Sequence, residues 1–374
     1  MTRITGRING FDALRAAAMW LGVLLHSLIV YKATPEANWP SDNSRYVLLD
    51  WLYEFIHIFR MPLFYLVSGF FAHLVITKYG ILFFAKQRFK RIFIPFIIGL
   101  IVIVPVSLLP FHFHRFYFIE QNSINDAFAF SIRQMFRWNG MAHLWFLYYL
   151  IFFYVLSYLI AELSNKAKKW KFQVVGKTEA GFRIVLTLSF ILFFSLLYFS
   201  NYITPPVYTG IKPNLPYILY YGFFYFSGWI IYVFFQAHGM LLRSGVFLMV
   251  AGIALSITRF LFLENQSYFL NTLLAAIETF FLVYGILGVF LKLFNNESRF
   301  WRYLSDSSYW VYLIHVSIVG SAQVLLLSAN LHGVFKLLIV LLITIFITLI
   351  TYRYFVRYTI IGEVLNGKRE KQTR

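Results

Sequence analysis

The first long apolar stretch of the chain carries three side chains that can do chemistry. Residues 11–31, FDALRAAAMWLGVLLHSLIVY, include Asp12, Arg15 and His26. On a helix of 3.6 residues per turn these side chains share one face, with Arg15 and His26 about 16 Å apart along the axis. Ionisable groups inside a bilayer are costly and usually face a protein interior or a water-filled cavity. We interpret the stripe as the lining of a pathway. Alternatively, Arg15 reaches the lipid headgroups and His26 is an interior histidine without a chemical role.

A second apolar stretch, residues 51–71 with the sequence WLYEFIHIFRMPLFYLVSGFF, repeats this arrangement. Glu54, His57 and Arg60 follow one another at intervals of three residues. If the two stretches are neighbouring antiparallel helices, a rise of about 1.5 Å per residue brings Glu54 to the depth of His26. The alternative is an ion network that only holds the two helices together.

A carboxylate beside a histidine is what a general base requires, because the carboxylate fixes the tautomer of the ring and stabilises the imidazolium. We therefore predict that His26 and Glu54 form a catalytic pair. The residues predicted to support this pair are Asp12, His57 and Arg60.

A basic cluster follows the second stretch, in residues 86–96, KQRFKRIFIPF. Arg88, Lys90 and Arg91 are suited to hold the phosphates of a nucleotide-like donor. The alternative is stop-transfer charge at a membrane boundary. The chain has no glycine signature of a Walker or Rossmann nucleotide site.

Other polar and aromatic residues are weaker candidates. HLWFL places His143 and Trp145 at the outer end of an apolar stretch, where they can meet an acceptor or belong to an interfacial aromatic belt. Two further histidines, in FHFH at 111–114, lack an evident third ligand, so we predict no metal site. The sequence leaves the roles of Glu278 and His315 open.

The composition defines the class of protein that must position these residues. The chain has 374 residues, of which 60% are hydrophobic and only 13% charged, and its mean hydropathy is +0.69. Apolar runs of this length and number predict an all-α, polytopic membrane protein. Cysteine is absent, which excludes disulfides and thiol chemistry.

The hydropathy predicts about ten transmembrane helices. They are expected at 11–31, 47–75, 92–110, 143–163, 184–201, 215–235, 244–262, 271–291, 303–325 and 334–353. Residues 1–353 then form a single transmembrane domain, and 354–374 form a basic tail. The connector 111–142 is expected to lie on the membrane surface or to cap a cavity, and 164–183 to be a flexible basic linker.

The distribution of charge predicts the orientation. The net charge is +18, and the connectors and tails on the side of the termini hold 23 Lys and Arg residues, against six on the other side. Positive charge gathers on the cytoplasmic side of membrane proteins, so both termini are expected in the cytoplasm. The basic residues therefore do not indicate a nucleic-acid partner.

Several segments resemble a known family. Arg15 and His26 enclose ten residues, and Arg88 and Arg91 enclose two, as in the arginine and histidine motifs of the acyltransferase-3 family of membrane acyltransferases. FDALRAAAMWLGVLLH, FIHIFRMPLFYLVSGFF, HLWFLYYL and YLSDSSYWVYLIH are similar to family segments and occur in the same order. FIHIFRM, SGFF and HLWFL are most similar to the branch of the glucan biosynthesis protein C, which contains periplasmic-glucan succinyltransferases.

The resemblance implies a fold, a reaction and roles for residues. It implies about ten helices in the inner membrane of a bacterium and transfer of an acyl group from cytoplasmic acyl-CoA to a hydroxyl of an extracytoplasmic glycan. His26 would be the catalytic histidine, as base or as acyl carrier, and Arg15, Arg88 and Arg91 the donor-side residues. Acetyl-CoA or succinyl-CoA is then a substrate, and we expect no permanently bound cofactor.

A transporter or exporter of a glycan or an acyl compound is the rival interpretation, because buried His, Glu and Arg residues are equally natural there. The spans show no inverted repeat that would favour it. The sequence leaves open the acyl group, the acceptor, a covalent acyl-histidine and a homo-oligomer.

Overall fold

The computed structural model describes residues 8–37, 39–138, 140–166, 178–203, 208–235, 238–262 and 267–367. Its α-helices are α1 (Asn9–Leu28), α2 (Val47–Tyr79), α3 (Ile81–Arg88), α4 (Ile94–Ile98), α5 (Val104–His114), α6 (Ile124–Met135), α7 (Trp145–Lys166), α8 (Glu179–Ser200), α9 (Leu215–Val233), α10 (Gly239–Phe262), α11 (Tyr268–Leu293), α12 (Arg299–Leu326), α13 (Gly333–Thr351) and α14 (Ile360–Asn366). These ranges contain no strand.

Nine helical segments within the described ranges are long and apolar enough to cross a membrane. They correspond to nine of the ten predicted spans, which confirms the all-α polytopic class. The remaining predicted span, 215–235, is also helical, because α9 covers most of it. Its many tyrosines lower its hydropathy, and it is not among the nine.

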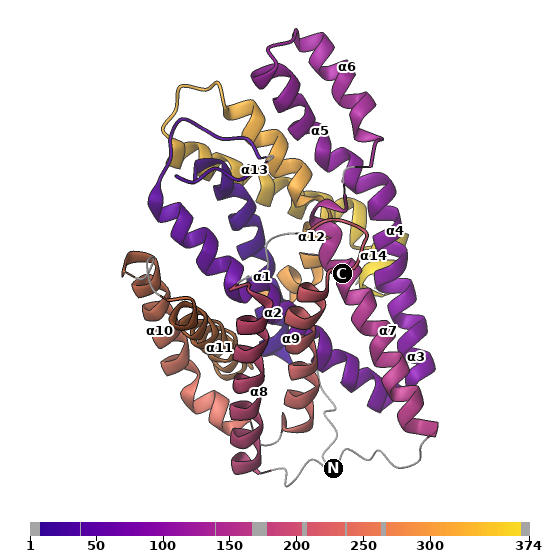
Figure 1. Cartoon of the computed structure of the whole chain (residues 1–374). Helices are drawn as coiled ribbons and strands as arrows, with labels where there is room; N and C mark the ends of the chain where they lie inside the picture. The colour runs from indigo at the N-terminus through magenta and orange to yellow at the C-terminus, as the bar shows by residue number, and fades with distance from the viewer. Residues whose placement is uncertain are drawn as a thin grey trace.

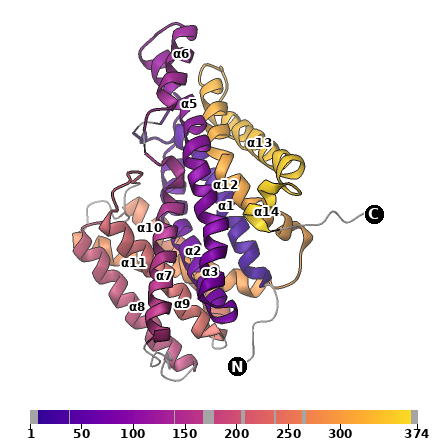
Figure 2. The ribbon, with the colours of Figure 1, turned by 90° about the vertical axis from the view of Figure 1, so that its right-hand side faces the viewer.

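The helices form an inner group and an outer group. Most of the apolar length of α1, α2 and α11 is buried inside the bundle, whereas α8, α10 and α13 leave most of theirs exposed. Figure 1 shows α1 and α2 running through the middle of the molecule. In Figure 2, α8, α10 and α11 lie to one side of this centre, and α13 and α14 lie to the other. The polar stripes predicted on the first two spans are thus on buried helices.

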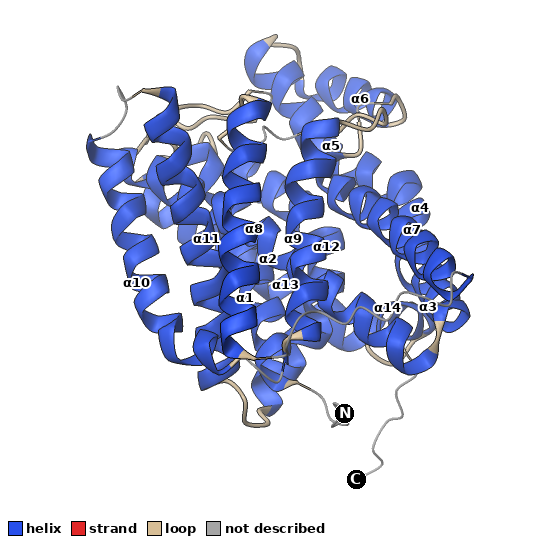
Figure 3. Cartoon of the chain, turned by 60° about the horizontal axis from the view of Figure 1, so that its bottom comes forward, coloured by secondary structure: helices blue, strands red, loops and turns tan. Residues whose placement is uncertain are grey.

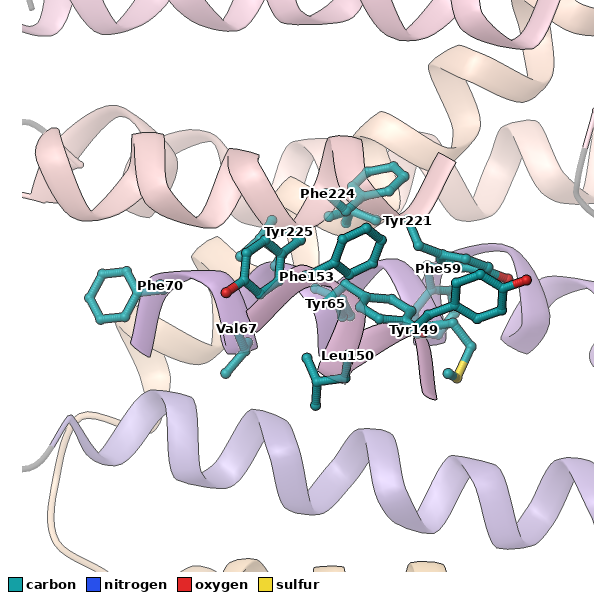
Figure 4. Close-up of a cluster of buried hydrophobic side chains, with 14 of the residues drawn as sticks. Phe59, Tyr65, Val67, Phe70, Tyr149, Leu150, Phe153, Tyr221, Phe224 and Tyr225 are labelled. Carbon is teal, nitrogen blue, oxygen red and sulfur yellow. The ribbon is translucent and has the colours of Figure 1, made fainter. Parts of the chain in front are cut away.

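An aromatic core fixes α2 in this central position. Tyr65 of α2 packs against Phe153 of α7 and Tyr221 of α9, with ring centroids 5.5 and 4.8 Å apart. Figure 4 shows these rings interleaved between the three helices. Aromatic side chains bury large areas at little rotamer cost, so the cluster holds α2 rigidly against α7 and α9.

Two glycines let α2 and α9 approach until their backbones touch. A Cβ atom at Gly69 would lie 1.8 Å from the carbonyl oxygen of Tyr225, and one at Gly228 would lie 2.0 Å from that of Leu66. No larger side chain fits at either position without separating the helices. This contact, like the aromatic core, determines which face of α2 points toward α1.

The third span is longer than the predicted 92–110. It is helical from Ile81 to Ile119 and includes π-helical turns at Phe89–Phe93, Gly99–Ile103 and Arg115–Ile119. Pro95 and Pro105 are each the second residue after one of the first two turns. Proline lacks an N–H group and crowds the preceding turn of an α-helix, and a widened turn accommodates it. The helix therefore continues through both prolines.

The expected surface connector 111–142 is a helical hairpin in its first part. After Ile119 the chain turns, and α6 begins at Ile124, where the Ser123 side chain accepts a hydrogen bond from the N–H of Asp126. α6 then packs back along α5. Figures 1 and 2 show the hairpin at one end of the bundle.

The C-terminal segment is not a simple tail in its first half. A π-helical turn at Tyr352–Val356 and helix α14 fold this segment back onto the bundle, close to α12. Figure 3 shows α14 beside α3, at the end of the bundle where the N-terminus lies. Residues 368–374 of the predicted tail, residues 1–7 and positions 167–177 of the predicted linker lie outside the described residues.

Candidate active site

A cavity of about 1840 Å³ extends through the bundle between the inner helices. Most of the residues that the sequence singled out line it. They are Arg15, His26, Glu54, His57, Arg60, Arg88, Arg91, His143 and Trp145. Asp12 and Lys90 do not line the cavity.

Three histidines from three helical segments meet in its middle. The ring of His26 in α1 lies 5.2 Å from that of His315 in α12, centroid to centroid. His315 lies 5.5 Å from His143, at the start of α7. A ring nitrogen of each one, His26 Nδ1, His143 Nδ1 and His315 Nε2, is buried without a hydrogen-bond partner in the described part of the chain. The cluster therefore keeps free nitrogen atoms inside a cavity, where a base or a nucleophile has to be.

The loop between α1 and α2 covers His26. The indole of Trp39 stacks on the His26 ring, with centroids 5.6 Å apart and the planes 16° from parallel. Gln323 of α12 accepts a hydrogen bond from Trp39 Nε1 and donates to the carbonyl oxygens of His26 and Ser27, at the end of α1. One side chain thus satisfies the last carbonyls of α1 and fixes the indole over the histidine.

A buried ion pair anchors the same loop. Lys336 in the first turn of α13 contacts Asp42 at 2.7 Å, and both side chains are almost completely buried. A desolvated pair of this kind requires good geometry to be tolerated, and removal of one partner leaves an uncompensated charge. The ion pair therefore ties the loop between α1 and α2 to α13 and holds it over the cavity.

Arg60 of α2 lies close to the histidines. Its Nη1 atom is 2.1 Å from where a Cβ atom at Gly22 would stand, one helical turn before His26. The absence of a side chain at Gly22 is what admits the guanidinium group. Arg60 is 8% exposed, and it makes no ion pair in the described part of the chain. It is thus a buried charge turned toward the cavity, and the alternative of a helix-binding ion network has no contact to support it.

The predicted partner of His26 is further away than the sequence suggested. Glu54 lines the cavity, but among the described residues no hydrogen bond or ion pair joins it to His26. The rings next to His26 belong to Trp39 and His315. His57, one turn from Glu54, stacks on Tyr53 at 5.8 Å. The orienting role of Glu54 stays a prediction.

The basic groups gather at the opposite end of the cavity. Arg15 forms an ion pair with Asp12, and its Nη2 atom is 3.4 Å from the hydroxyl oxygen of Ser305. Asp12 therefore pairs with Arg15 on their shared helix face, and its role as a support of the catalytic pair stays a prediction. Asn366 of α14 donates a hydrogen bond to the carbonyl oxygen of Asp306, next to Ser305. This places the end of α14 beside Arg15.

Arg88 and Arg91 complete this basic end. Arg91 lies against Gly367, where a Cβ atom would stand 2.6 Å from its Nη2 atom, and Gly367 has a φ of +91°. Arg88 lies 4.8 Å from the ring centroid of Tyr154. Lys90 points elsewhere and makes an exposed ion pair with Glu363 of α14 at 3.5 Å. Two of the three basic residues predicted in this cluster thus face the cavity.

A second polar lobe of the cavity lies between α2, α10 and α11. Glu278 of α11 is 2% exposed and pairs with Arg259 of α10. The pair gives Glu278 the partner that the sequence could not identify. Trp51 donates a hydrogen bond to the Ser256 hydroxyl at 3.2 Å. The lobe therefore offers aromatic and polar side chains together, the combination that sugars bind.

His143 and Trp145 are buried, which argues against a belt at the membrane interface. Trp145 packs on Tyr217 and Tyr221, with ring centroids 5.7 and 5.4 Å away. The hydroxyl of Tyr312 donates a hydrogen bond to the carbonyl oxygen of His143. His143 thus lies at the centre of the cavity and not at its outer rim. In the described ranges, no group of three or more His, Asp or Glu residues is arranged to hold a metal ion.

Sequence reasoning missed several residues of the site. Trp39 and Gln323 carried no motif, and Arg259 stands alone in an apolar stretch. A lone arginine in such a stretch is itself a signal, because it requires a buried partner. Trp39 and Gln323 offered no signal, since their contacts with His26 depend on the packing of three separate segments.

Comparisons with known proteins show what the chain is similar to. Residues 8–353 match the family described as "Acyltransferase domain". The chain is 27% identical, over 149 residues, to "Glucans biosynthesis protein C" of Salmonella typhi and of Salmonella typhimurium. The match covers 39% of this chain and only 37% of either relative. No solved structure matches the chain.

Proposed function

This chain belongs to the acyltransferase-3 family, and on that premise we propose that it moves an acetyl or succinyl group from cytoplasmic acyl-CoA to a hydroxyl of an extracytoplasmic glycan or glycolipid. The observation that carries the proposal is the shape of the cavity. It joins a basic end, with Arg88 and Arg91, to the buried ring of His26. CoA has a matching shape, because a long flexible arm separates its phosphates from its thioester.

In this proposal the chemistry takes place at His26. The hydroxyl oxygen of the acceptor attacks the carbonyl carbon of the thioester, and His26 takes the hydroxyl proton through Nε2. The C–S bond breaks, and the leaving thiolate takes that proton to give CoA and an ester. In the covalent variant, Nε2 first attacks the carbonyl carbon and the CoA thiolate leaves. The acceptor hydroxyl then attacks the acyl-histidine, the ester is released from Nε2, and the hydroxyl proton goes to the thiolate to give CoA. Both routes need a lone pair on Nε2.

The proposed acceptor reaches His26 from the lobe that Glu278 and Arg259 line. The name of the relatives from Salmonella refers to glucan biosynthesis, which favours a glucan acceptor. Aromatic faces such as that of Trp51 suit the apolar faces of sugar rings, and carboxylates suit their hydroxyls. In this arrangement the donor and the acceptor enter from opposite ends of one cavity.

The donor side requires that the basic end faces the cytoplasm. Two contacts join connectors that the sequence predicted on the same side of the membrane. The side chain of Asn9 donates a hydrogen bond to the carbonyl oxygen of Asn295, and Lys90 pairs with Glu363. The excess of basic residues in these connectors supports a cytoplasmic position for this end and for both termini, with the protein in a bacterial inner membrane.

Cysteine labelling tests the orientation, and the natural chain provides a background without cysteine. We expect a cysteine at Asn125, in the first turn of α6, to react with a membrane-impermeant maleimide in intact cells. A cysteine at Glu370 should react only after the cells are opened. Labelling of position 370 from outside would reverse the orientation and move the donor site to the wrong side.

Turnover by the purified protein tests the function itself. In detergent, with acetyl-CoA or succinyl-CoA and a glucan, we expect release of the CoA thiol together with acylated glucan detected by mass spectrometry. Both products must depend on the glucan. Passage of glucan or acyl compound through proteoliposomes, without release of the thiol, would instead favour the rival transporter.

A further inference from the structure

The contact between His26 and His315 contains unused hydrogen-bonding capacity. The two rings are 5.2 Å apart and belong to α1 and α12, which pack along each other. His26 Nδ1 and His315 Nε2 are both buried, and neither has a hydrogen-bond partner among the described residues. A buried polar nitrogen left without a partner destabilises the folded protein. The two unpaired ring nitrogens therefore need an explanation.

Backbone contacts determine the tautomer of His315. Its Nδ1 atom lies 2.8 Å from the carbonyl oxygen of Tyr312 and 3.0 Å from that of Val311. Carbonyl oxygens only accept hydrogen bonds, so Nδ1 must carry the hydrogen. In the neutral ring, Nε2 then has a lone pair and can only accept. His315 therefore offers an acceptor to the cavity.

The same reasoning excludes His143 as the donor to that acceptor. His143 Nε2 lies 3.0 Å from the carbonyl oxygen of Leu313, so the hydrogen of the neutral ring is on Nε2. Its Nδ1 atom then has a lone pair as well. Two lone pairs cannot bind each other, although the two rings are only 5.5 Å apart. Of the two neighbouring imidazoles, only His26 can donate to His315.

We propose that His315 is a positioning residue that accepts a hydrogen bond from His26 Nδ1–H and so keeps the lone pair on His26 Nε2. The inference rests on the proposed function, in which His26 is base or acyl carrier. His315 performs for His26 the task that the sequence assigned to Glu54. A neutral imidazole replaces the carboxylate as the group that selects the tautomer. The two rings are close without a completed hydrogen bond, as catalytic contacts often are before they tighten during the reaction, and this proximity already selects the tautomer.

No proton is lost or gained by His315 in this arrangement. When His26 Nε2 takes the hydroxyl proton, His26 becomes an imidazolium with hydrogens on both nitrogens, and His315 still accepts from Nδ1–H. When the thiolate takes the proton back from Nε2, the original pair is restored. Trp39 stacks on His26 and leaves the ring edge free for this contact.

Two substitutions of His315 separate positioning from packing. The amide of asparagine occupies the place of Nδ1, so His315→Asn keeps the contacts with the carbonyls of Val311 and Tyr312 but has no acceptor near His26. The amide of glutamine reaches the place of Nε2, so His315→Gln restores that acceptor. We expect His315→Asn to lower kcat about tenfold to a hundredfold without changing KM for acyl-CoA. His315→Gln should recover most of the loss.

A purely structural role predicts the reverse order, because asparagine retains the backbone contacts and glutamine disturbs them. Parental kcat in His315→Asn, or an equal loss in both variants, would overturn the proposal. A fall in kcat for Glu54→Gln with none for His315→Asn would return the task to Glu54. His26→Ala in the same assay tests the proposed function separately. Normal turnover by that variant would show that His26 is neither base nor acyl carrier, whatever His315 does.

A measurement on the parent protein keeps the proposal testable if a variant does not fold. Solid-state NMR of the protein with ¹⁵N-labelled histidine distinguishes a hydrogen on Nδ1 from one on Nε2. We expect both His26 and His315 to carry it on Nδ1. A hydrogen on His26 Nε2 in the substrate-free protein would show that His315 does not select the tautomer.

Discussion

His26→Ala is expected to abolish acyl transfer while the protein still folds and inserts into the membrane. A general base contributes about 10²–10⁴ in rate, and a covalent carrier would contribute more, so turnover should fall by at least about a hundredfold. Folding should persist because the end of α1 is held through backbone carbonyls by Gln323 and not through the imidazole. Release of the CoA thiol by purified variant and parent measures the effect.

His114 provides the matched control for this substitution. It also lines the cavity, but in α5, where its ring stacks on Phe118 at 5.6 Å. His114→Ala removes the same group and should leave turnover near that of the parent. Near-normal turnover by His26→Ala, or an equal fall in both variants, would show that the position of His26 in the histidine cluster has no special role.

Replacing both Arg88 and Arg91 by lysine is expected to weaken acyl-CoA binding by at least about tenfold. Loss of one charge-assisted contact costs about 1.5–3 kcal/mol, and lysine cannot present the planar fork with which arginine binds phosphate at two points. The substitution keeps the positive charge on that side, so insertion and orientation should not change. Equilibrium binding of acyl-CoA to the purified protein measures the loss.

Lys90 offers a control within the same segment. Its side chain is half exposed, pairs with Glu363 and does not line the cavity. Lys90→Gln removes a whole positive charge, and yet we expect it to change the affinity less than the double lysine variant, which removes none. If Lys90→Gln has the larger effect, the segment acts through its net charge, and no phosphate site needs to be assigned to Arg88 and Arg91.

The helical period made part of the site predictable. Residues three, four or eleven apart share a helix face, so the stripe of Asp12, Arg15 and His26 was visible without a structure. The apolar lengths likewise predicted the spans. Ionisable residues inside such spans needed a polar surrounding, which is why nine of the predicted site residues line one cavity.

The partners of His26 were not predictable in the same way. Depth along two helices says nothing about how each is rotated about its axis, so equal depth for Glu54 and His26 did not make them neighbours. The rotation of α2 depends on the contacts at Gly69 and Gly228. The rings that do surround His26 come from positions far away in the chain, such as Trp39 and His315.

The folded C-terminal segment was also missed, for a different reason. The whole stretch 354–374 was expected to be a tail because of its basic residues, but most of these lie after Gly367, and the part that folds is largely apolar. α14 has only seven residues and could not be stable alone. It is ordered through tertiary contacts, such as the hydrogen bond from Asn366 to the carbonyl oxygen of Asp306 and the approach of Gly367 to Arg91.

The length of the cavity has a consequence for the cell's energy supply. A polar passage that reaches both sides of a membrane would let protons and sodium ions run down the gradient that drives ATP synthesis. Fixed positive charges along a pore raise an electrostatic barrier to cations. Arg15 and Arg88 stand at the basic end of this cavity, Arg60 lies close to the histidines, and Trp39 covers His26. If the proposed function holds, the arginines that suit an anionic donor therefore have a second effect, because their charges oppose the leak of cations along the donor path.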